Sequence, residues 1–196
     1  MSRYYYKDDK LLSENGAAVM MGWERPIMKK VAEILTKTKG DVLNIGFGMG
    51  IVDTFIQEGN PHTHTIIESH PDVIEYMKNN GWESKSTCIF SKWQEQIGKI
   101  GPFDSIYMDT WGDSRVKFIP DLLSGSLKVG GKFLMWYNKD EFNMVIESLS
   151  DDYHVSYEYI PNNNLIPSQG GQHEGSGLYI DPSLDLITIP IITKLR

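Results

Sequence analysis

A glycine-rich turn and the acid that follows it are the first residues whose types and spacing point to chemistry. The turn Gly46–Gly50, with the letters GFGMG, lies between a predicted strand and a predicted helix. Small residues there let a ligand approach the backbone, and the start of the helix favours an anionic group. Glu68 ends the next predicted strand about 20 residues after Gly48, the spacing of a carboxylate that binds ribose hydroxyls. Each feature alone can be structural, but together they predict a nucleoside site.

The spacing of the glycines argues against a dinucleotide. A dinucleotide fingerprint has a third glycine three positions after the second, where this chain has Ile51, and Gly50 comes too early. A glycine turn with an acid at the end of the second strand is also typical of class I methyltransferases, whose cofactor S-adenosylmethionine has no pyrophosphate. Trp93 follows the third predicted strand, where it either forms an aromatic wall against adenine or covers the sheet edge. The sequence does not separate these two roles.

Two further acids are placed to act on a substrate. Asp109 ends the predicted strand 103–109. Open α/β sheets bind ligands at the carboxyl ends of their strands, so we expect Asp109 beside the cofactor. Glu24 lies in a largely apolar segment just ahead of the first predicted helix. Residue chemistry alone favours an electrostatic role for Glu24 at the N-terminus of that helix.

The elements that position these residues alternate along the chain. Apolar spacing predicts helices over 26–39, 50–58, 71–80, 117–124 and 141–149, and strands over 41–46, 63–68, 86–90, 103–109, 132–137 and 155–160. Strands that alternate with helices form a parallel sheet covered on both faces, so the predicted fold class is α/β. The stretch 128–131 is predicted as a turn and 162–177 as a long loop. The β-branched segment 184–193 contains Pro190 and is predicted near a sheet edge or bulge.

Composition bounds the class of protein. The 196 residues, of which 40% are apolar, suffice for one domain. The net charge of −7 disfavours nucleic acid as a partner and favours a cationic small molecule or a basic peptide, although such acidity also serves solubility. One cysteine, Cys88, excludes an internal disulfide and a multi-cysteine metal site. With no targeting segment and no apolar run of membrane length, the chain is expected to be soluble and cytoplasmic, without a membrane partner.

Several segments, in order along the chain, resemble the guanidinoacetate methyltransferase family. They are VMMGWERPIM at 19–28, IGFGMG at 45–50, IE at 67–68, YMDT at 107–110 and ITIPIITK at 187–194. The sequence is also similar to the related protein arginine methyltransferases that modify the internal guanidino nitrogen. The resemblance runs from about Tyr6 to the C-terminus. Its G-F-G-M and W-E-x-P motifs are far more specific than a general methyltransferase turn.

The resemblance implies a fold and the residues that bind both substrates. The expected fold is the Rossmann-like class I methyltransferase, a mostly parallel seven-stranded sheet with helices on both faces. It would form a single domain over 1–196, whose N-terminal segment 1–25 closes over the cofactor. The acceptor guanidinium would be held by Glu24 and Asp109, with Thr110 beside them. The residues implied to bind S-adenosylmethionine are Tyr6, Met21, Trp23, Met28, Gly46, Phe47, Gly48, Met49, Glu68, Ser69, Trp93 and Asp109. Methionines at such spacing are by default core residues, and no metal ion is expected.

A pair of carboxylates suits methyl transfer to a guanidino group. The attacking nitrogen needs a lone pair, and a guanidinium, with a pKa above about 12, has none available. Two carboxylates fix the planar cation through bidentate hydrogen bonds, and one can accept a proton as the nitrogen attacks. Asp109 and Glu24 are therefore the candidate catalytic residues. The expected activity is an S-adenosylmethionine-dependent N-methyltransferase acting on a small guanidino compound such as guanidinoacetate.

Two alternative functions stay open. The acceptor is instead an arginine in a peptide or protein, for which an acidic open groove would help, or the chain is a catalytically silent nucleoside-binding scaffold. The segment 111–115 matches neither branch of the family. Arg115 could bind a substrate carboxylate, but an arginine that leads into a helix is more often an exposed surface charge.

The remaining polar residues carry little information. The stretch Gln169–Glu174 either caps the acceptor pocket or is an ordinary loop, and its His173 and Glu174 alone make no metal site. His62 and His64 are expected as surface or strand residues. Neither the acceptor nor the oligomeric state follows from the sequence.

Overall fold

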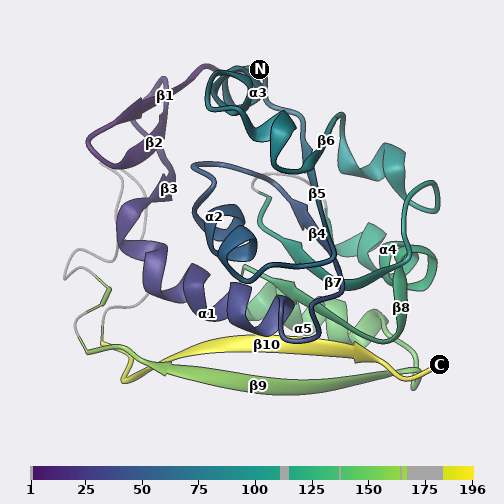
Figure 1. Cartoon of the computed structure of the whole chain (residues 1–196). Helices are drawn as coiled ribbons and strands as arrows, with labels where there is room; N and C mark the ends of the chain where they lie inside the picture. Colours follow the sequence, from purple (N-terminus) through teal and green to yellow (C-terminus); the bar gives the residue numbers. More distant parts are fainter. Residues whose placement is uncertain (1, 111–114, 137, 164, 167–182) are drawn as a thin grey trace.

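A seven-stranded sheet lies at the centre of the computed structural model, with helices on both faces (Figure 1). The structure describes residues 2–110, 115–136, 138–163, 165–166 and 183–196. The strands of this sheet are β4 (Asp41–Ile45), β5 (Thr63–Glu68), β6 (Thr87–Phe90), β7 (Phe103–Met108), β8 (Leu127–Met135), β9 (Tyr153–Pro161) and β10 (Leu186–Lys194). Their order is β6-β5-β4-β7-β8-β10-β9. The first five are parallel, and β10 runs antiparallel to β8 and β9, which confirms the predicted α/β, mostly parallel sheet.

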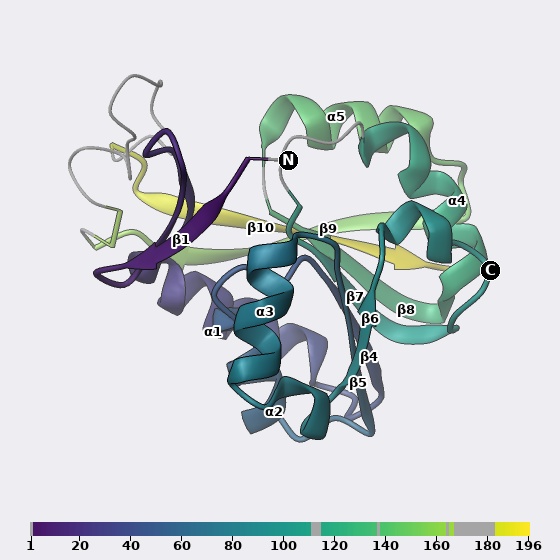
Figure 2. The same ribbon diagram turned by 90° about the horizontal axis from the view of Figure 1, so that it is seen from above.

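The helices divide into two layers, as the view in Figure 2 shows. One face of the sheet is covered by α1 (Arg25–Leu35), α2 (Ile51–Glu58) and α3 (Pro71–Asn79), and the other by α4 (Ile119–Ser126) and α5 (Lys139–Ser148). Since successive side chains of a strand point to opposite faces, each central strand contributes to two hydrophobic cores. In β7, Tyr107 packs in the core under α1–α3, whereas Ile106 and Met108 pack under α4 and α5.

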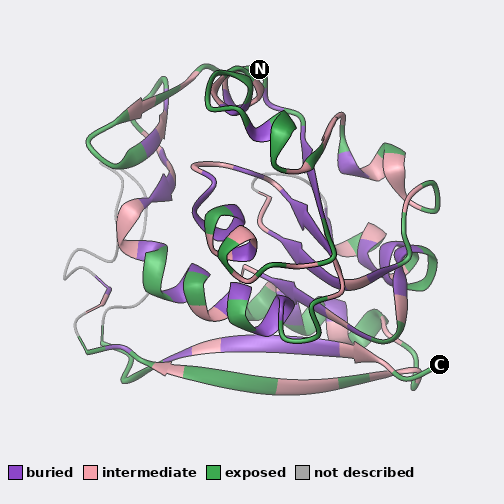
Figure 3. Cartoon of the chain, viewed as in Figure 1, coloured by how far each residue is buried: buried purple, intermediate pink, exposed green. Residues whose placement is uncertain are grey.

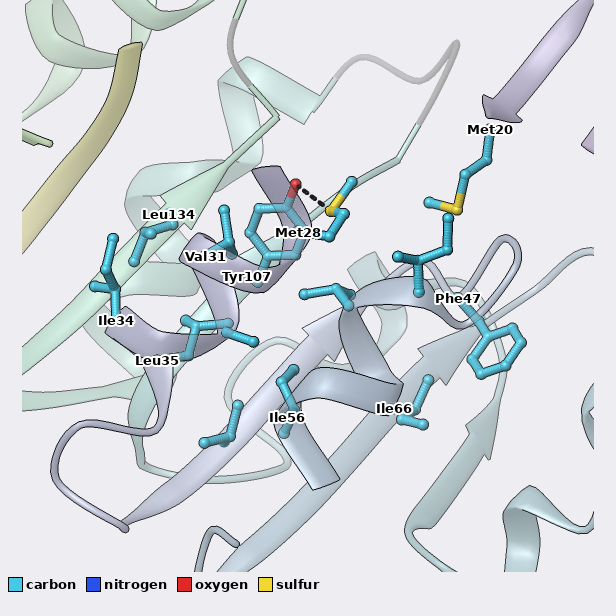
Figure 4. Packing of buried hydrophobic residues seen from close by; sticks show 14 of the residues in the cluster. Met20, Met28, Val31, Ile34, Leu35, Phe47, Ile56, Ile66, Tyr107 and Leu134 are labelled. Carbon is cyan, nitrogen blue, oxygen red and sulfur yellow. Dashed lines mark hydrogen bonds between the residues drawn. The ribbon is translucent and has the colours of Figure 1, made fainter. Parts of the chain in front are cut away.

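The buried residues lie along the inner helix faces and the central strands (Figure 3). Figure 4 shows the core under α1, where Met28, Val31 and Leu35 surround Tyr107. The Tyr107 hydroxyl donates to the Met28 sulfur at 3.6 Å, so the one polar atom of this fully buried ring has a partner. This core fixes α1, which begins directly after Glu24, and β7, which ends directly before Asp109.

The stretch 128–131, predicted as a turn, is instead part of a strand. β8 runs without interruption from Leu127 to Met135. Gly130 has a φ of +78°, and the pairing of β8 with β7 shifts register between Phe103 and Ser105. The glycine therefore serves a β-bulge, which requires the same left-handed backbone as many turns.

The C-terminal strand, predicted near a sheet edge or bulge, is the second strand from one edge of the sheet. β10 is placed between β8 and β9, so β9 is the edge strand. Pro190 lies opposite Tyr157 of β9, while the pairs between β10 and β8 are at Ile192 and Thr193. The missing N–H of Pro190 thus falls outside the β8 ladder, and an interior strand tolerates the proline.

A small antiparallel sheet near the N-terminus was not predicted. It consists of β1 (Tyr4–Lys7), β2 (Lys10–Ser13) and β3 (Ala18–Met21), in that order. Figure 1 shows it, in purple, beside α3 and leading into α1. The ring of Tyr4 stacks on His70 with centroids 3.7 Å apart, and that of Tyr6 stacks on Tyr76 at 4.0 Å. These contacts attach the small sheet to α3 and to the residues after β5.

Among the described residues, the helices are too short or too polar to cross a membrane.

Candidate active site

A pocket of about 670 Å³ lies at the carboxyl ends of the parallel strands. Its walls come from the residues that directly follow β4, β5, β6, β7 and β8, and from the N-terminal sheet. Of the site residues expected from the sequence, the pocket brings together Gly46, Gly48, Glu68, Ser69, Trp93, Asp109 and Thr110. Its volume is that of a small-molecule or cofactor site.

The glycine turn brings the backbone of β4 against that of β7. Gly46 donates its N–H to the Ile67 carbonyl at 2.9 Å and has a φ of +92°. A Cβ atom at this position would lie 2.2 Å from the carbonyl oxygen of Asp109. Both the backbone conformation and the lack of space require glycine here.

Glu68 accepts hydrogen bonds from three backbone N–H groups. Its Oε2 accepts from Phe47 at 2.9 Å, and its Oε1 accepts from Ser69 at 2.6 Å and from His70 at 2.8 Å. A carboxylate has about four lone-pair positions, so capacity for a further donor such as a hydroxyl remains. The carboxylate therefore ties the glycine turn to the loop after β5 while it lines the pocket.

The N-terminal sheet contacts the glycine turn directly. The Tyr6 hydroxyl donates to the Gly48 carbonyl at 2.8 Å, and the Met49 N–H points to the Met20 sulfur at 3.2 Å. Met20 also lies so close to Gly48 that an added Cβ would be 2.9 Å from its sulfur. Figure 4 shows Met20 reaching from its strand toward the turn. The sheet thus forms one wall of the pocket.

Asp109 is placed at the pocket by the end of β7. Its backbone N–H donates to the Ile45 carbonyl at 2.8 Å, which continues the β4–β7 ladder past the strand. Its Oδ2 atom is buried and has no hydrogen-bond partner within the described part of the chain. Burial raises the pKa of Asp109 to about 7, while the charge of Arg115 opposes the rise and that of Asp53 adds to it. A buried oxygen of this kind needs a donor, and a bound cation supplies one.

Glu24 is buried and directly precedes α1. It is 1% exposed, and its Oε1 accepts from the Met21 N–H at 2.7 Å, at the start of the 3₁₀ turn Gly22–Glu24. The residue occupies the N-cap position of α1 without a side-chain capping bond to that helix, and its electrostatic role there stays a prediction. Burial first, and then the nearby charge of Asp109, raise the pKa of Glu24 well above its usual range. The two acids therefore lie close enough to repel each other.

Arg115 was expected to be an exposed surface charge, and this expectation is wrong. The residue is 6% exposed and lines the pocket. Its Nε and Nη2 donate to Glu141 Oε2 on α5, and its Nη1 donates to the Thr110 carbonyl at 2.8 Å. An anion on a neighbouring helix makes this burial possible, and sequence spacing does not reveal that pairing.

A buried polar network beneath the glycine turn was also missed. Asn44 Nδ2 donates to both oxygens of Asp53 and to the Gly46 carbonyl, each at 2.9 Å. His64 Nε2 lies 3.1 Å from Asp53 Oδ1, and its Nδ1 lies 2.7 Å from Gln57 Nε2. The signal was an asparagine and an aspartate in otherwise apolar segments. His64 is a buried strand residue and His62 an exposed one, as expected.

Several residues implied by the resemblance lie outside the pocket wall. Met28 is fully buried in the core (Figure 4), and Phe47 packs against Trp82 with ring centroids 5.0 Å apart. The pocket-lining residues likewise do not include Tyr6, Met21, Trp23, Glu24 and Met49, although Tyr6 and Met49 contact the pocket through the glycine turn. Trp93, by contrast, is buried at the wall, edge-on to Phe118 at 6.0 Å.

The described residues contain no group of three or more acids, histidines or cysteines that could hold a metal ion. The stretch Gln169–Glu174 and residues 111–114 lie outside the described part of the chain. Most of the predicted loop 162–177 lies there as well.

The solved structures to which this chain is similar include methyltransferases. The chain is similar to an O-methyltransferase, TomG, from Streptomyces achromogenes in complex with SAM, with a TM-score of 0.60, 9% identity, and coverage of 87% of this chain and 80% of that chain. It is also similar to a precorrin-6y C5,15-methyltransferase from Geobacter metallireducens, with a TM-score of 0.58, 15% identity and coverage of 85% and 88%. The fold is that of the class I S-adenosylmethionine-dependent methyltransferases. The cofactor of this class is S-adenosylmethionine.

The sequence comparisons place the chain within that class. Residues 1–151 match the family described as guanidinoacetate N-methyltransferase, and the chain belongs to this family. It is 48% identical over 120 residues to protein arginine N-methyltransferase 2 of Candida glabrata, covering 55% of this chain and 29% of that protein. The protein of the same name from Aspergillus oryzae is 43% identical over 143 residues, covering 67% of this chain and 34% of that protein. The one from Yarrowia lipolytica is 33% identical over 178 residues, covering 79% of this chain and 38% of that protein. The chain thus spans about a third of the length of these relatives.

Proposed function

We propose that this chain is an S-adenosylmethionine-dependent methyltransferase domain that acts on the guanidino group of arginine in a peptide or protein. The observation that carries the proposal is the pair of buried acids, Glu24 and Asp109, of which Asp109 lines the pocket beside the glycine turn and Glu68. One acid of the pair has an oxygen without a partner. Buried acids that repel each other suit a bound cation.

The residues of the pocket fit the cofactor of this class. Gly46 and Gly48 line the pocket, Glu68 retains capacity for ribose hydroxyls, and Trp93 offers a buried aromatic wall to adenine. We infer that Tyr6 and Met20 of the N-terminal sheet, together with Met49 of the glycine turn, shape the same site, which supports the expectation that segment 1–25 covers the cofactor. When bound, S-adenosylmethionine supplies a methyl group on a positively charged sulfur.

The acid pair would perform the chemistry on the acceptor. Glu24 and Asp109 hold the guanidinium in a fixed plane, and positioning of this kind can lower a barrier by roughly 7–11 kcal/mol. As the nitrogen bonds to the methyl carbon, the carbon–sulfur bond breaks, and the proton that leaves the guanidinium passes to Asp109 and then to solvent. A base with a pKa near the working pH is suited to this step, and burial brings the pKa of Asp109 to about 7.

Arginine within a peptide is the better supported acceptor. The related fungal proteins are named protein arginine N-methyltransferase 2. Guanidinoacetate, favoured by the sequence motifs, carries a carboxylate that needs a cation or N–H donors. Arg115 lines the pocket, but three of its five N–H groups already donate to Glu141 and the Thr110 carbonyl. A peptide arginine makes no such demand.

Competition between acceptors tests the proposal. Purified protein is incubated with S-adenosylmethionine and either an arginine peptide or guanidinoacetate, and methylated products are quantified by mass spectrometry. We expect kcat/KM to be at least about tenfold higher for the peptide, the factor that corresponds to 1.4 kcal/mol of binding energy. A higher kcat/KM for guanidinoacetate would overturn the choice of acceptor. Absence of S-adenosylmethionine binding in calorimetry would instead favour a silent scaffold.

A further inference from the structure

Arg115 occupies an unusual place among the pocket residues. It is a cation, it is almost completely buried, and it lies within the wall that carries Asp109. Its guanidinium connects two parts of the chain: Nε and Nη2 donate to Glu141 on α5, and Nη1 donates to the carbonyl of Thr110, the residue that follows Asp109. A planar guanidinium with fixed donors is suited to holding such a geometry.

The charges around Asp109 are unequal in sign. Asp53 on α2 has a charge that disfavours the ionised form of Asp109, and Arg115 from the 3₁₀ turn Arg115–Phe118 is the cation whose charge favours it. The charge of Asp109 in turn raises the pKa of Glu24 in the 3₁₀ turn Gly22–Glu24. Asp109 Oδ2 has no hydrogen-bond partner among the described residues, so at this oxygen the ionised form relies on the nearby positive charge.

We propose that Arg115, oriented by Glu141, is a positioning residue that holds the Thr110 backbone in place and keeps Asp109 ionised for methyl transfer. The inference rests on the proposed function of Asp109 as the acid that takes the proton. Arg115 itself takes up no proton and forms no bond to the reacting atoms. Glu141 has the opposite effect on Asp109, because its negative charge offsets part of the charge of Arg115.

The pH dependence of kcat/KM tests this role. In the wild type, kcat/KM rises with pH as Asp109 loses its proton and levels off above a pH of about 7. Arg115→Met removes the favourable charge, so the rise moves to higher pH by about one unit or more, and kcat/KM at neutral pH falls about tenfold. Arg115→Lys keeps the charge and restores most of the wild-type profile.

Glu141→Gln provides the opposite change. The amide oxygen still accepts from Arg115, but the negative charge is gone, so the rise in kcat/KM moves to lower pH. Opposite shifts in Arg115→Met and Glu141→Gln support the proposal. If both variants lose activity while the pH at which the rate rises is unchanged, the pair only holds α5 in place and the proposal is overturned. Lys117→Met, which removes an exposed cation from the same turn, is the matched control and leaves the profile unchanged.

A second measurement does not depend on turnover. The carboxyl ¹³C resonance of Asp109, identified by its loss in Asp109→Asn, is titrated in the folded wild type, Arg115→Met and Glu141→Gln proteins. The midpoints move up in Arg115→Met and down in Glu141→Gln if the proposal holds, and coincide with the wild type if it fails. If the wild type methylates no guanidino compound, the proposed function fails, while this titration still decides whether Arg115 controls the charge of Asp109.

Discussion

The carboxylate proposed to bind the cofactor and the two proposed to bind the acceptor differ in how many hydrogen bonds they accept. At the cofactor end, Glu68 accepts three backbone N–H bonds before any ligand arrives. At the acceptor end, Glu24 accepts one backbone N–H, and Asp109 Oδ2 accepts none. Burial of an acid without donors costs stability, and here it raises the pKa values of both Glu24 and Asp109. In the proposed function, the carboxylate that binds the cofactor already has its backbone donors in the folded chain, whereas the pair of acids that binds the acceptor is completed by a cation.

Asp109→Asn is the most damaging test of this contrast. The amide keeps the shape of the side chain but neither carries a charge nor accepts the proton, so we expect turnover to fall by about 10²-fold or more. Binding of S-adenosylmethionine, measured by calorimetry, stays close to that of the wild type. Asp104→Asn, at the opposite end of β7, is the control. Near-normal turnover in Asp109→Asn would remove this residue from the mechanism.

Glu24→Gln is expected to weaken the acceptor end less severely. Its amide oxygen can still accept from the Met21 N–H, but the bond to the guanidinium loses its charge, which costs about 10- to 100-fold in kcat/KM for the acceptor. Steady-state kinetics with varied peptide concentration measures this loss. Glu33→Gln, an exposed acid on α1, should behave as the wild type. Unchanged acceptor kinetics in Glu24→Gln would leave Asp109 as the sole acid of the site.

Glu68→Gln tests the carboxylate proposed to bind the cofactor. An amide nitrogen would face one of the three N–H groups that now donate to the carboxylate, so the loop and the glycine turn separate slightly. We expect S-adenosylmethionine to bind about tenfold more weakly, with the KM of the peptide unchanged. Calorimetry on this variant and on Glu75→Gln, an exposed acid of α3, provides the measurement. An effect confined to the peptide KM would contradict the division of the pocket.

Tyr6→Phe should give the smallest effect. It removes one neutral hydrogen bond, from the Tyr6 hydroxyl to the Gly48 carbonyl, and keeps the ring stacked on Tyr76. Loss of such a bond weakens S-adenosylmethionine binding by about two- to tenfold. Tyr5→Phe, whose ring is exposed, serves as the control. Equal affinities in the two variants would show that the N-terminal sheet does not support the cofactor end.

The repeating parts of the fold could be predicted from local patterns. The strand 63–68 has its predicted bounds, and α2 and α3 begin and end within a residue of theirs. Alternation of apolar residues and the glycines and prolines between elements are properties of nearby residues, so they are visible in sequence. One pattern with two structural uses was predicted wrongly: the glycines at 130–131 serve a bulge rather than a turn. Pro190 lies opposite the edge strand, which agrees with the predicted position near a sheet edge.

The candidate site divides in the same way. Gly46, Glu68 and Asp109 follow strand ends, and their places in the pocket could be inferred from the alternation of strands and helices. The partners of Arg115 and of Asp53 could not be inferred. Glu141 lies 26 positions from Arg115, and His64 lies 11 positions from Asp53 on a different element. Such pairs depend on how helices pack on the sheet, which no local spacing encodes.

The sequence by itself determined the class of fold, the glycine turn after one strand, the acids at the ends of two others, and the acid before the first helix. Periodicity locates the strands, and the residues at the carboxyl ends of parallel strands meet at one edge of the sheet. Tertiary structure alone decided how each acid is solvated. It gave Glu68 three backbone donors, buried Glu24 and Asp109 near each other, and placed a paired Arg115 in the same wall. The chemistry of an acid depends on burial and neighbouring charge, and both arise only when distant segments pack together.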